Sequence, residues 1–414
     1  MSEQFAVRFC VVLALVLPCT RVRASSALDA SSSTGAIPEN AVEGSATGSV
    51  SSYADTDDSH VVTPEARAEV HDAGRTWNVE GGYAADVVAG ASVVLDVVSA
   101  ASPLVPADGV VHWHEVRQAG SLEGTYQPHA FGVGANAAVS SEPDCFFVEG
   151  GGRLIWDVVP SRWRLFLGYT RDHDVNGRAG TALDVFSHTF DEDRVAAGVT
   201  VLPSSGVVLG FEGDLILQHG DASSPYRHLP LFTPAEAAAI PKGASVARVN
   251  DARIPLSVAE SLPTSRGRYA LTAQLEYRTS VGVLRARERL YADSWELYAS
   301  TTDVGYGFRL SSRWVVRPGF RVHGQSATYF WDRAYITPAS GVLPRYRTGD
   351  RELGPLVTVA GGAFLGFDIG SSKKPDSWTL FLDVNAMQTA FLDHLYVTSR
   401  TAGFGTAGLL ASFE

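Results

Sequence analysis

Three arginines at alternate positions are the side chains with the clearest capacity for chemistry in this sequence. Arg285, Arg287 and Arg289 share one face of a predicted strand, because successive strand side chains point to opposite faces. Rings of basic side chains attract anions when they line a pore. Glu276 is the nearest acid and cannot neutralise all three, so the group indicates uncompensated positive charge.

Other reactive patterns are sparse. The sequence contains neither a Gly-x-Ser-x-Gly nucleophile elbow nor a Gly-rich phosphate loop of the Walker type. His112 and His114 share a strand face, but zinc usually needs three or four ligands. Asp172, His173 and Asp174 fall in a predicted loop, where solvated charges are ordinary. We therefore expect no catalytic residue, no metal site and no cofactor.

The stretch 265–325 shows which elements carry the arginines. Apolar and polar side chains alternate through four successive strands, which gives each strand one apolar and one charged face. A transmembrane barrel places the apolar faces in lipid and the charged faces in its lumen. Glu288 is an exception on the lipid face, and we expect it near a membrane interface, where a charge costs less.

The same alternation continues along the chain and predicts the fold class. We expect an all-β protein, a transmembrane antiparallel up-and-down β-barrel of fourteen strands with both termini in the periplasm, since closed bacterial barrels have even strand numbers. The first strand is long enough for a hairpin, so sixteen is the alternative. The predicted strands are 77–98, 114–126, 129–139, 145–158, 161–171, 192–202, 206–217, 266–278, 282–291, 295–310, 312–324, 354–367, 376–387 and 403–413.

The longer connections all fall at one end, which we expect to be extracellular. They are 99–113, 172–190, 218–265 and 325–353. The largest contains a capping box, with Thr233 as N-cap, Pro234 at the first helical position and Glu236 at the third. A short helix here either folds inward and narrows the pore or lies on the surface of a mobile loop.

Four tryptophans open predicted strands after short turns at the other end. An indole ring suits a membrane–water interface because it is apolar while its N–H needs a polar partner. We expect an interfacial girdle at Trp77, Trp163, Trp314 and Trp378.

The predicted lumen face is rich in charge. Two interpretations stay open: an ion-pair lattice that fills and stiffens the barrel, or an arginine-lined pathway for anions. The candidate lumen-lining residues are Arg164, Arg268, Arg278, Arg285, Arg287, Arg289, Arg317, Arg321, Glu149, Glu212, Asp214 and Glu276.

The N-terminal region predicts export. Arg8 precedes an apolar run and small residues follow near Ala24, so residues 1–24 are typical of a cleaved signal peptide. Residues 25–74 are rich in Ser, Ala and Asp without periodicity, which predicts a disordered periplasmic linker, and 75–414 form the barrel. Lipidation at Cys19 fits poorly after Pro18. The mature chain would then keep only Cys145.

Four short segments also resemble a known family. They are Asp96-Val-Val-Ser-Ala-Ala-Ser-Pro103, Ser223-Ser-Pro-Tyr226-Arg227, Ser265-Arg-Gly-Arg268 and Gln325-Ser-Ala327 followed by Tyr329-Phe330. In order and spacing across about 85–414, they are similar to the Gram-negative outer-membrane barrel proteins known as domain of unknown function 3570. The resemblance implies a barrel in the outer membrane and supplies no substrate or catalytic residue.

Two classes of function follow. The first is an outer-membrane channel for small solutes, anionic ones in particular, through the arginine-rich lumen. The second is a barrel without transport, a scaffold or adhesin that binds envelope proteins through its long loops. The net charge of −12 argues against nucleic acid as a partner. Neither class is enzymatic, and both place the protein in outer-membrane lipid.

Overall fold

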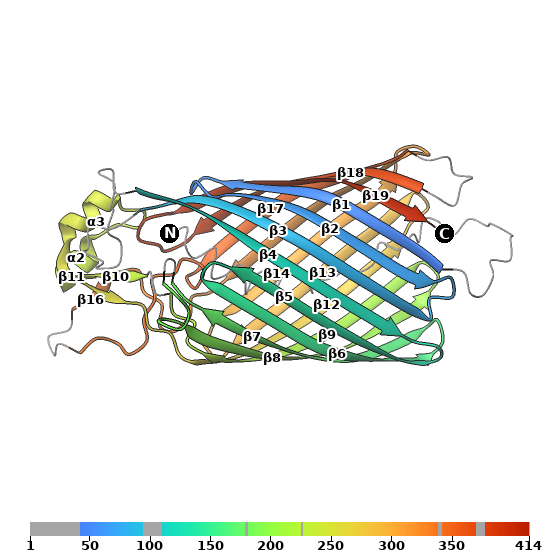
Figure 1. Ribbon diagram of the computed structural model, residues 1–414. Coiled ribbons are helices and arrows are strands. Elements are labelled where there is room, and N and C mark those ends of the chain that lie inside the picture. The colour runs from blue at the N-terminus through green and yellow to red at the C-terminus, as the bar shows by residue number, and fades with distance from the viewer. Residues whose placement is uncertain are drawn as a thin grey trace.

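A closed antiparallel β-barrel dominates the computed structural model, as Figure 1 shows. The structure describes residues 42–93, 110–178, 181–224, 227–337, 342–369 and 377–413. The predicted signal peptide and Cys19 lie outside these residues. Sixteen strands close the barrel. They are β1 (Val42–Asp55), β2 (His60–Asp72), β3 (Trp77–Val93), β4 (Val110–Tyr126), β5 (Phe131–Glu142), β6 (Cys145–Val159), β7 (Trp163–Asn176), β8 (His188–Ser204), β9 (Val207–Gly220), β12 (Ser265–Arg278), β13 (Gly282–Asp293), β14 (Tyr298–Arg309), β15 (Trp314–Gln325), β17 (Leu356–Asp368), β18 (Ser377–Phe391) and β19 (Ser399–Phe413).

The predicted barrel is confirmed, and its strand number is sixteen. Each of the fourteen predicted strands is present, but the extra pair is not a hairpin within 77–98, because β3 is one continuous strand. The extra pair comes from residues 42–72, so the prediction of a disordered linker is wrong for this segment. β1 closes the barrel by pairing with β19 on one side and with β2 on the other.

Small side chains explain why this closing pair escapes sequence analysis. The face of β1 that points outward carries Gly44, Ala46 and Gly48 between Val42 and Val50, so its apolar signal is weak. Pairing on both edges satisfies the backbone hydrogen bonds of β1 all the same, and a closed barrel leaves no edge open.

The two ends of the barrel differ in their connections. At the turn end the strands are joined by short turns at 73–76, 127–130, 160–162, 205–206, 279–281 and 310–313. At the loop end lie 177–187, 221–264, 326–355 and 392–398. The predicted placement of the long loops at one end is therefore confirmed for the described residues. The loop after β7 is shorter than expected, so Asp172, His173 and Asp174 lie on the strand itself.

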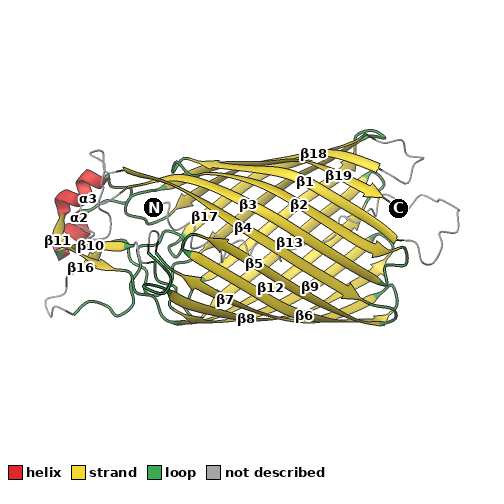
Figure 2. Cartoon of the chain, viewed as in Figure 1, coloured by secondary structure: helices red, strands yellow, loops and turns green. Residues whose placement is uncertain are grey.

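The loops 221–264 and 326–355 fold into a cap beyond the loop end, visible at the left of Figure 2. The cap contains a three-stranded sheet of β10 (His228–Phe232), β11 (Arg253–Ala259) and β16 (Tyr335–Ile336), with helices α2 (Pro234–Ala239) and α3 (Val246–Ala252). The predicted capping box is confirmed, since the Thr233 side chain accepts a hydrogen bond from the Glu236 N–H at 3.3 Å. The helix does not fold into the barrel.

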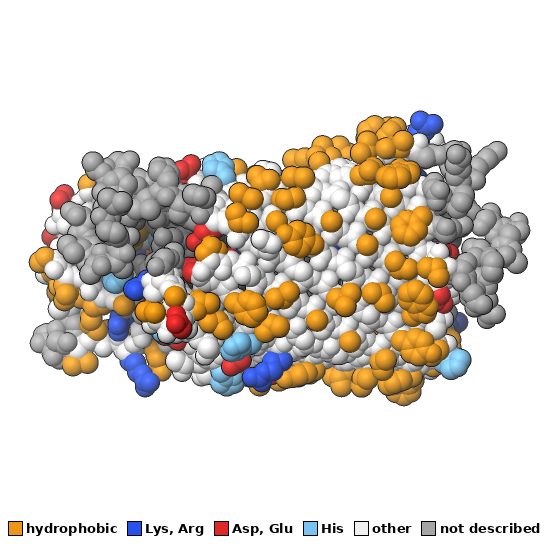
Figure 3. Space-filling model, in the orientation of Figure 1, with side chains coloured by type: hydrophobic (Ala, Val, Ile, Leu, Met, Phe, Trp, Pro, Cys, Tyr) orange, Lys and Arg blue, Asp and Glu red, His pale blue; other side chains and the backbone are white. Residues whose placement is uncertain are grey.

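The outer wall of the barrel is apolar. Figure 3 shows hydrophobic side chains spread over the barrel wall, and outward residues such as Leu167, Phe211 and Leu271 are exposed by half or more. Alternation sends the charged residues of the same strands inward. Among the described residues, no helix is long and apolar enough to cross a membrane.

Glu288 does lie on this outer wall, as predicted. In the strand register it lies opposite Ala273, which is midway between the outward Tyr269 and Tyr277. Its expected position near a membrane interface stays a prediction.

Candidate functional site

The strands place every predicted lumen residue on the inward face. On β13, for example, Arg285, Arg287 and Arg289 lie opposite Glu276, Gln274 and Thr272 of β12, which alternate with outward-facing tyrosines and leucines. His323 also points inward, where its Nδ1 lies 2.8 Å from the Thr301 hydroxyl. Asp157, Arg153 and Asp303 share the lumen with them.

Most of the predicted arginines are ion-paired across strands. Arg164 binds Asp157 through two hydrogen bonds of 2.7 and 2.9 Å. The other pairs are Arg285–Glu276 at 2.9 Å, Arg289–Asp214 at 3.4 Å, Arg268–Glu192 at 3.8 Å and Arg321–Asp303 at 2.5 Å. An ion-pair lattice therefore forms a large part of the lumen wall.

Arg317 is arranged differently. Its guanidinium carbon lies 3.8 Å from the centre of the Phe364 ring, a cation–π contact, and it forms no ion pair among the described residues. Its Nε atom is buried without a hydrogen-bond partner. A lumen cation held by an aromatic face keeps its charge available to a passing anion.

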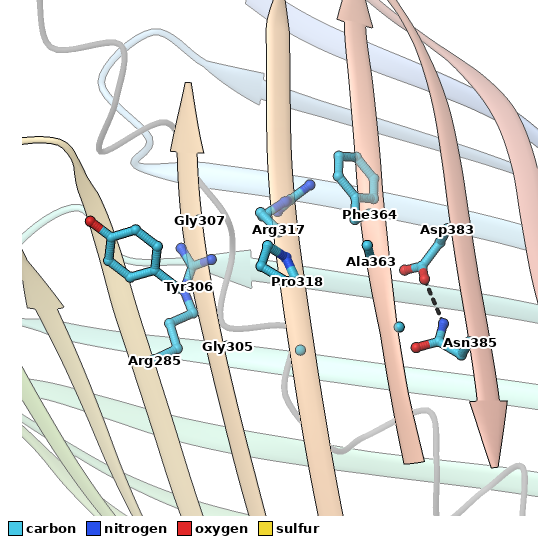
Figure 4. A pocket seen from close by; sticks show the side chains of 12 residues that line it. Arg285, Gly305, Tyr306, Gly307, Arg317, Pro318, Ala363, Phe364, Asp383 and Asn385 are labelled. Carbon is cyan, nitrogen blue, oxygen red and sulfur yellow. Dashed lines mark hydrogen bonds between the residues drawn. The ribbon is translucent and has the colours of Figure 1, made fainter. Parts of the chain in front are cut away.

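Arg317 borders a hollow in the lumen wall of about 330 Å³, drawn in Figure 4. Four glycines from β14, β15 and β17 leave it open, because side chains there would otherwise fill the space. Arg285 and Arg317 lie on one side of the hollow, and Asp383 and Asn385 lie on the other. The Asn385 side chain donates a hydrogen bond of 2.5 Å to Asp383. The glycines are Gly305, Gly307, Gly319 and Gly362. We call this hollow the arginine pocket.

Charge is unevenly distributed around the lumen. On β12–β15 inward arginines outnumber inward acids, and we call this side the arginine wall; its arginines are Arg266, Arg268, Arg278, Arg285, Arg287, Arg289, Arg309, Arg317 and Arg321. Across the barrel, on β2–β7, acids outnumber arginines, and we call this side the acidic wall; its acids are Glu65, Glu69, Glu80, Asp86, Glu115, Glu123, Glu142, Glu149, Asp157, Asp172 and Asp174. Opposed walls create a field across the lumen.

The predicted acids belong to different parts of this arrangement. Glu149 lies on the acidic wall and accepts a hydrogen bond of 2.7 Å from Asn136. Glu276 lies within the arginine wall. Glu212 and Asp214 lie on β9 between the walls, where Arg194 contacts Asp214 at 2.6 Å.

Water reaches part of the lumen wall. The side chains of Arg164, near the turn end, and Arg321, beyond the middle of β15, are 54% and 55% exposed. Arg266, at the loop end, is 14% exposed, and the Asp214 and Asp293 side chains are fully buried. The lumen is therefore hydrated around Arg164 and Arg321 and packed around Arg266, Asp214 and Asp293.

The cap has a polar core of its own. Arg227 contacts Glu260 and lies 3.2 Å from Asp350, and Thr348 donates to Glu260 at 2.5 Å. Burial opposes the charge of Arg227, but the two carboxylates outweigh it and raise the pKa of Arg227 above its ordinary value. Two apolar clusters flank this core, one centred on Phe232 and one on Trp295.

The residues of the family-like segments meet at the loop end. Arg227 lies in the polar core of the cap, and Arg266 pairs with Asp293 beneath the Trp295 ring, 4.2 Å from its centre. Gln325 donates to the carbonyls of Glu352 and Gly354 at 2.8 and 2.9 Å. These segments thus join the cap to the barrel rim. The segment 96–103 lies outside the described residues.

The four predicted girdle tryptophans lie at the turn end, each as the first or second residue of a strand. Trp163, Trp314 and Trp378 are 43–48% exposed on the outer wall, and Trp314 packs on Phe367 with ring centres 4.8 Å apart. Their position suits an interface at this end.

Sequence reasoning missed several residues of the site. Phe364, Asp383 and the four glycines were not among the candidates, although strict alternation from Trp378 places Asp383 inward. One acidic group also stands out: Glu115, Glu142 and Asp144 each bring an oxygen within 4.8 Å of the others. Acidic clusters are common on proteins, so this one does not by itself make a metal site.

Comparisons with known proteins find one family that matches part of the chain and solved structures with a distant likeness to it. The family described as protein of unknown function (DUF3570) matches residues 236–376, from α2 to the turn before β18, and confirms the resemblance over this segment. No curated protein matches the sequence.

Among solved structures, the siderophore receptor PirA from Acinetobacter baumannii is 11% identical with a TM-score of 0.39, over 84% of this chain and 53% of that one. A bacterial polysaccharide outer membrane secretin is 8% identical with a TM-score of 0.44, and the match covers 91% of this chain and 99% of the secretin. The toluene transporter TodX from Pseudomonas putida is 10% identical with a TM-score of 0.36, and the match covers 91% of this chain and 90% of TodX. This chain spans about half the length of PirA. Likenesses this distant indicate no substrate, and the fold rests on the strand pairing itself.

Proposed function

We propose that this protein is an outer-membrane channel for small anionic solutes, with the arginine pocket as its selective element. The observation that carries the proposal is Arg317, an inward guanidinium that contacts an aromatic face and forms no ion pair among the described residues. An apolar outer wall with tryptophans at the turn end supports a position in lipid, with that end in the periplasm.

The pocket would act by replacing part of the water around an anion. The stacked Phe364 ring fixes the Arg317 guanidinium, so little side-chain freedom is lost when an anion arrives. Arg285 adds a second positive charge on the neighbouring side, although Glu276 shares it. The acidic wall across the lumen repels the same anion, so passage would follow the arginine wall.

A flux assay with a matched pair of substitutions tests this. Gly319 and Gly361 sit on paired strands, and an added Cβ at either position would come no nearer than 3.8 Å to a backbone oxygen. Gly319 borders the arginine pocket, whereas Gly361 faces outward. Gly319→Leu should therefore slow efflux of methanesulfonate from proteoliposomes, and Gly361→Leu should not. Equal efflux of methanesulfonate and tetramethylammonium from the unmodified protein would contradict the proposal.

A second function is favoured by the cap. Its helices, sheet and buried ion cluster form an ordered surface at the loop end, which suits a binding protein of the envelope. Under this alternative, a scaffold or adhesin, the refolded barrel would conduct no ions, and deletion of the cap would abolish partner binding without unfolding the barrel.

The proposed location includes processing of the N-terminus. Residues 1–24 would direct export and be removed near Ala24, leaving a segment of fewer than twenty residues before β1. Mass spectrometry of the N-terminal peptide from outer-membrane fractions tests this. A retained leader would contradict it.

A further inference from the structure

Glu288 places a carboxylate on the outer wall, halfway between the levels of Tyr269 and Tyr277. Outward tyrosines favour the two membrane–water interfaces, so in the outer-membrane position proposed above this is the middle of the hydrocarbon layer. Ionisable residues at such depth are costly, and they mark functional sites more often than structural ones. The lumen function proposed above makes no use of this residue.

Two hydroxyl groups accompany the carboxylate. Ser300 donates to Glu288 Oε1 at 2.6 Å, and Thr302 donates to Oε2 at 2.5 Å. Both come from β14, where they lie opposite Leu290 and Glu288 in the register. A carboxylate has about four acceptor positions. Two hydroxyl donors therefore leave it able to accept further hydrogen bonds, and neither donor carries a positive charge.

An apolar groove of about 530 Å³ adjoins Glu288 on the outer wall. Leu165, Val199, Phe211 and Leu271 form its larger side chains, and Glu288 lines it from β13. The groove is hollow because Gly213 and other small residues stand between these side chains. A Cβ at Gly213 would lie 3.7 Å from the nearest atom, Leu271 Cδ2, so the space there is free.

We propose that this groove binds a membrane-dissolved apolar molecule that ends in a primary amine. The apolar body would fill the groove, and the ammonium group would pair with Glu288. Charge complementarity selects this ligand: in a medium of low dielectric constant, a carboxylate that is held by neutral hydroxyl groups gains most from a cation that can also donate hydrogen bonds. A carboxylate-bearing or uncharged chain lacks that gain. The inference rests on the proposed outer-membrane position and not on solute passage.

Equilibrium binding of radiolabelled decylamine to nanodiscs, with and without the refolded protein, tests the site. Saturable binding is expected, displaced by excess decylamine and not by decanoate or decane. Glu288→Gln keeps the shape of the side chain and removes its charge, so affinity should fall at least tenfold. Gly213→Leu should reduce binding by filling the groove. Ala135→Leu, on the outer wall at β5, is the matched control and should leave binding unchanged.

Unchanged affinity in Glu288→Gln, or equal displacement by decanoate, would overturn the proposal. Glu288→Leu guards against a folding artefact, because leucine suits lipid better than glutamate and should leave folding intact. Heat-modifiable gel mobility of each variant shows separately whether the barrel forms and inserts. Loss of that mobility in the unmodified protein would refute the membrane barrel, whereas loss of binding alone refutes the amine site.

Discussion

Removal of the Arg317 charge should shift the ion selectivity of the channel by a predictable amount. A unit charge about 6 Å from a passing ion, at the dielectric constant of water, contributes roughly 0.7 kcal/mol. Arg317→Gln removes this attraction for anions and the equal repulsion of cations. The two effects together, about 1.4 kcal/mol, correspond to about a tenfold fall in the anion-to-cation permeability ratio.

The assay is the reversal potential of the refolded barrel in a planar bilayer under a potassium chloride gradient. Low salt is needed, because the screening length is about 10 Å at 0.1 M and about 3 Å at 1 M. Arg171→Gln is the control for net charge, since Arg171 points outward and pairs with Asp191 and Asp193. It should leave the permeability ratio unchanged.

A second control removes a neutral pair from the lumen. Arg321→Gln combined with Asp303→Asn deletes an ion pair at 2.5 Å without changing net charge, and the permeability ratio should stay close to that of the unmodified protein. If Arg317→Gln conducts normally and keeps the original anion-to-cation permeability ratio, the Arg317 charge does not set the selectivity. An equal shift in Arg171→Gln would show that the ratio reports net charge alone.

Three further predictions concern the cap and barrel closure. Arg227→Met leaves two buried carboxylates without their cation and should cost the cap about 3–5 kcal/mol, measured by hydrogen exchange of residues 227–262; unchanged protection would contradict the buried cluster. His394, in the loop 392–398, packs on the cap with its Nε2 atom 3.2 Å from the Gly349 carbonyl oxygen, and burial lowers its pKa to about 4. Because this is below the unfolded value of about 6.5, the stability of the cap is full above pH 6.5 and should fall by up to about 3 kcal/mol towards pH 4. Limited proteolysis across that range, with His394→Gln as a pH-insensitive reference, tests this, and identical pH dependence in both would refute it. Deletion of residues 42–72 removes the partners of β3 and β19 and should abolish heat-modifiable mobility, whereas deletion of 25–41 should not.

The strands that the sequence revealed are those with large outward side chains. β12 alternates Tyr269 and Leu271 with polar residues, so the sequence shows both the two-residue period of a strand and the side chains that face outward. β1 has mostly small residues on its outward face between Val42 and Val50, and its hydrogen bonds to β2 and β19 define it as a strand. Pairing between the first and last strands is a property of the closed barrel that no local pattern carries.

The inward faces were predictable, but the contacts on them were not. Alternation places Arg289 and Asp214 in the lumen, yet their contact at 3.4 Å spans β12, which lies between β13 and β9. The arginine pocket depends on glycines brought together from three strands, and a glycine carries no signal in an alternating pattern. Glu288 shows the opposite case: its outward direction was clear from the sequence, and its position opposite Ala273 followed only from the register.

Single-channel recording of the unmodified, refolded protein asks whether the barrel conducts anions at all. Steady conductance is expected, with a reversal potential that shows preference for chloride over potassium, since the arginine pocket lies in the lumen wall. A correctly folded, heat-modifiable barrel that conducts nothing, or that prefers potassium, would contradict an arginine-lined anion path.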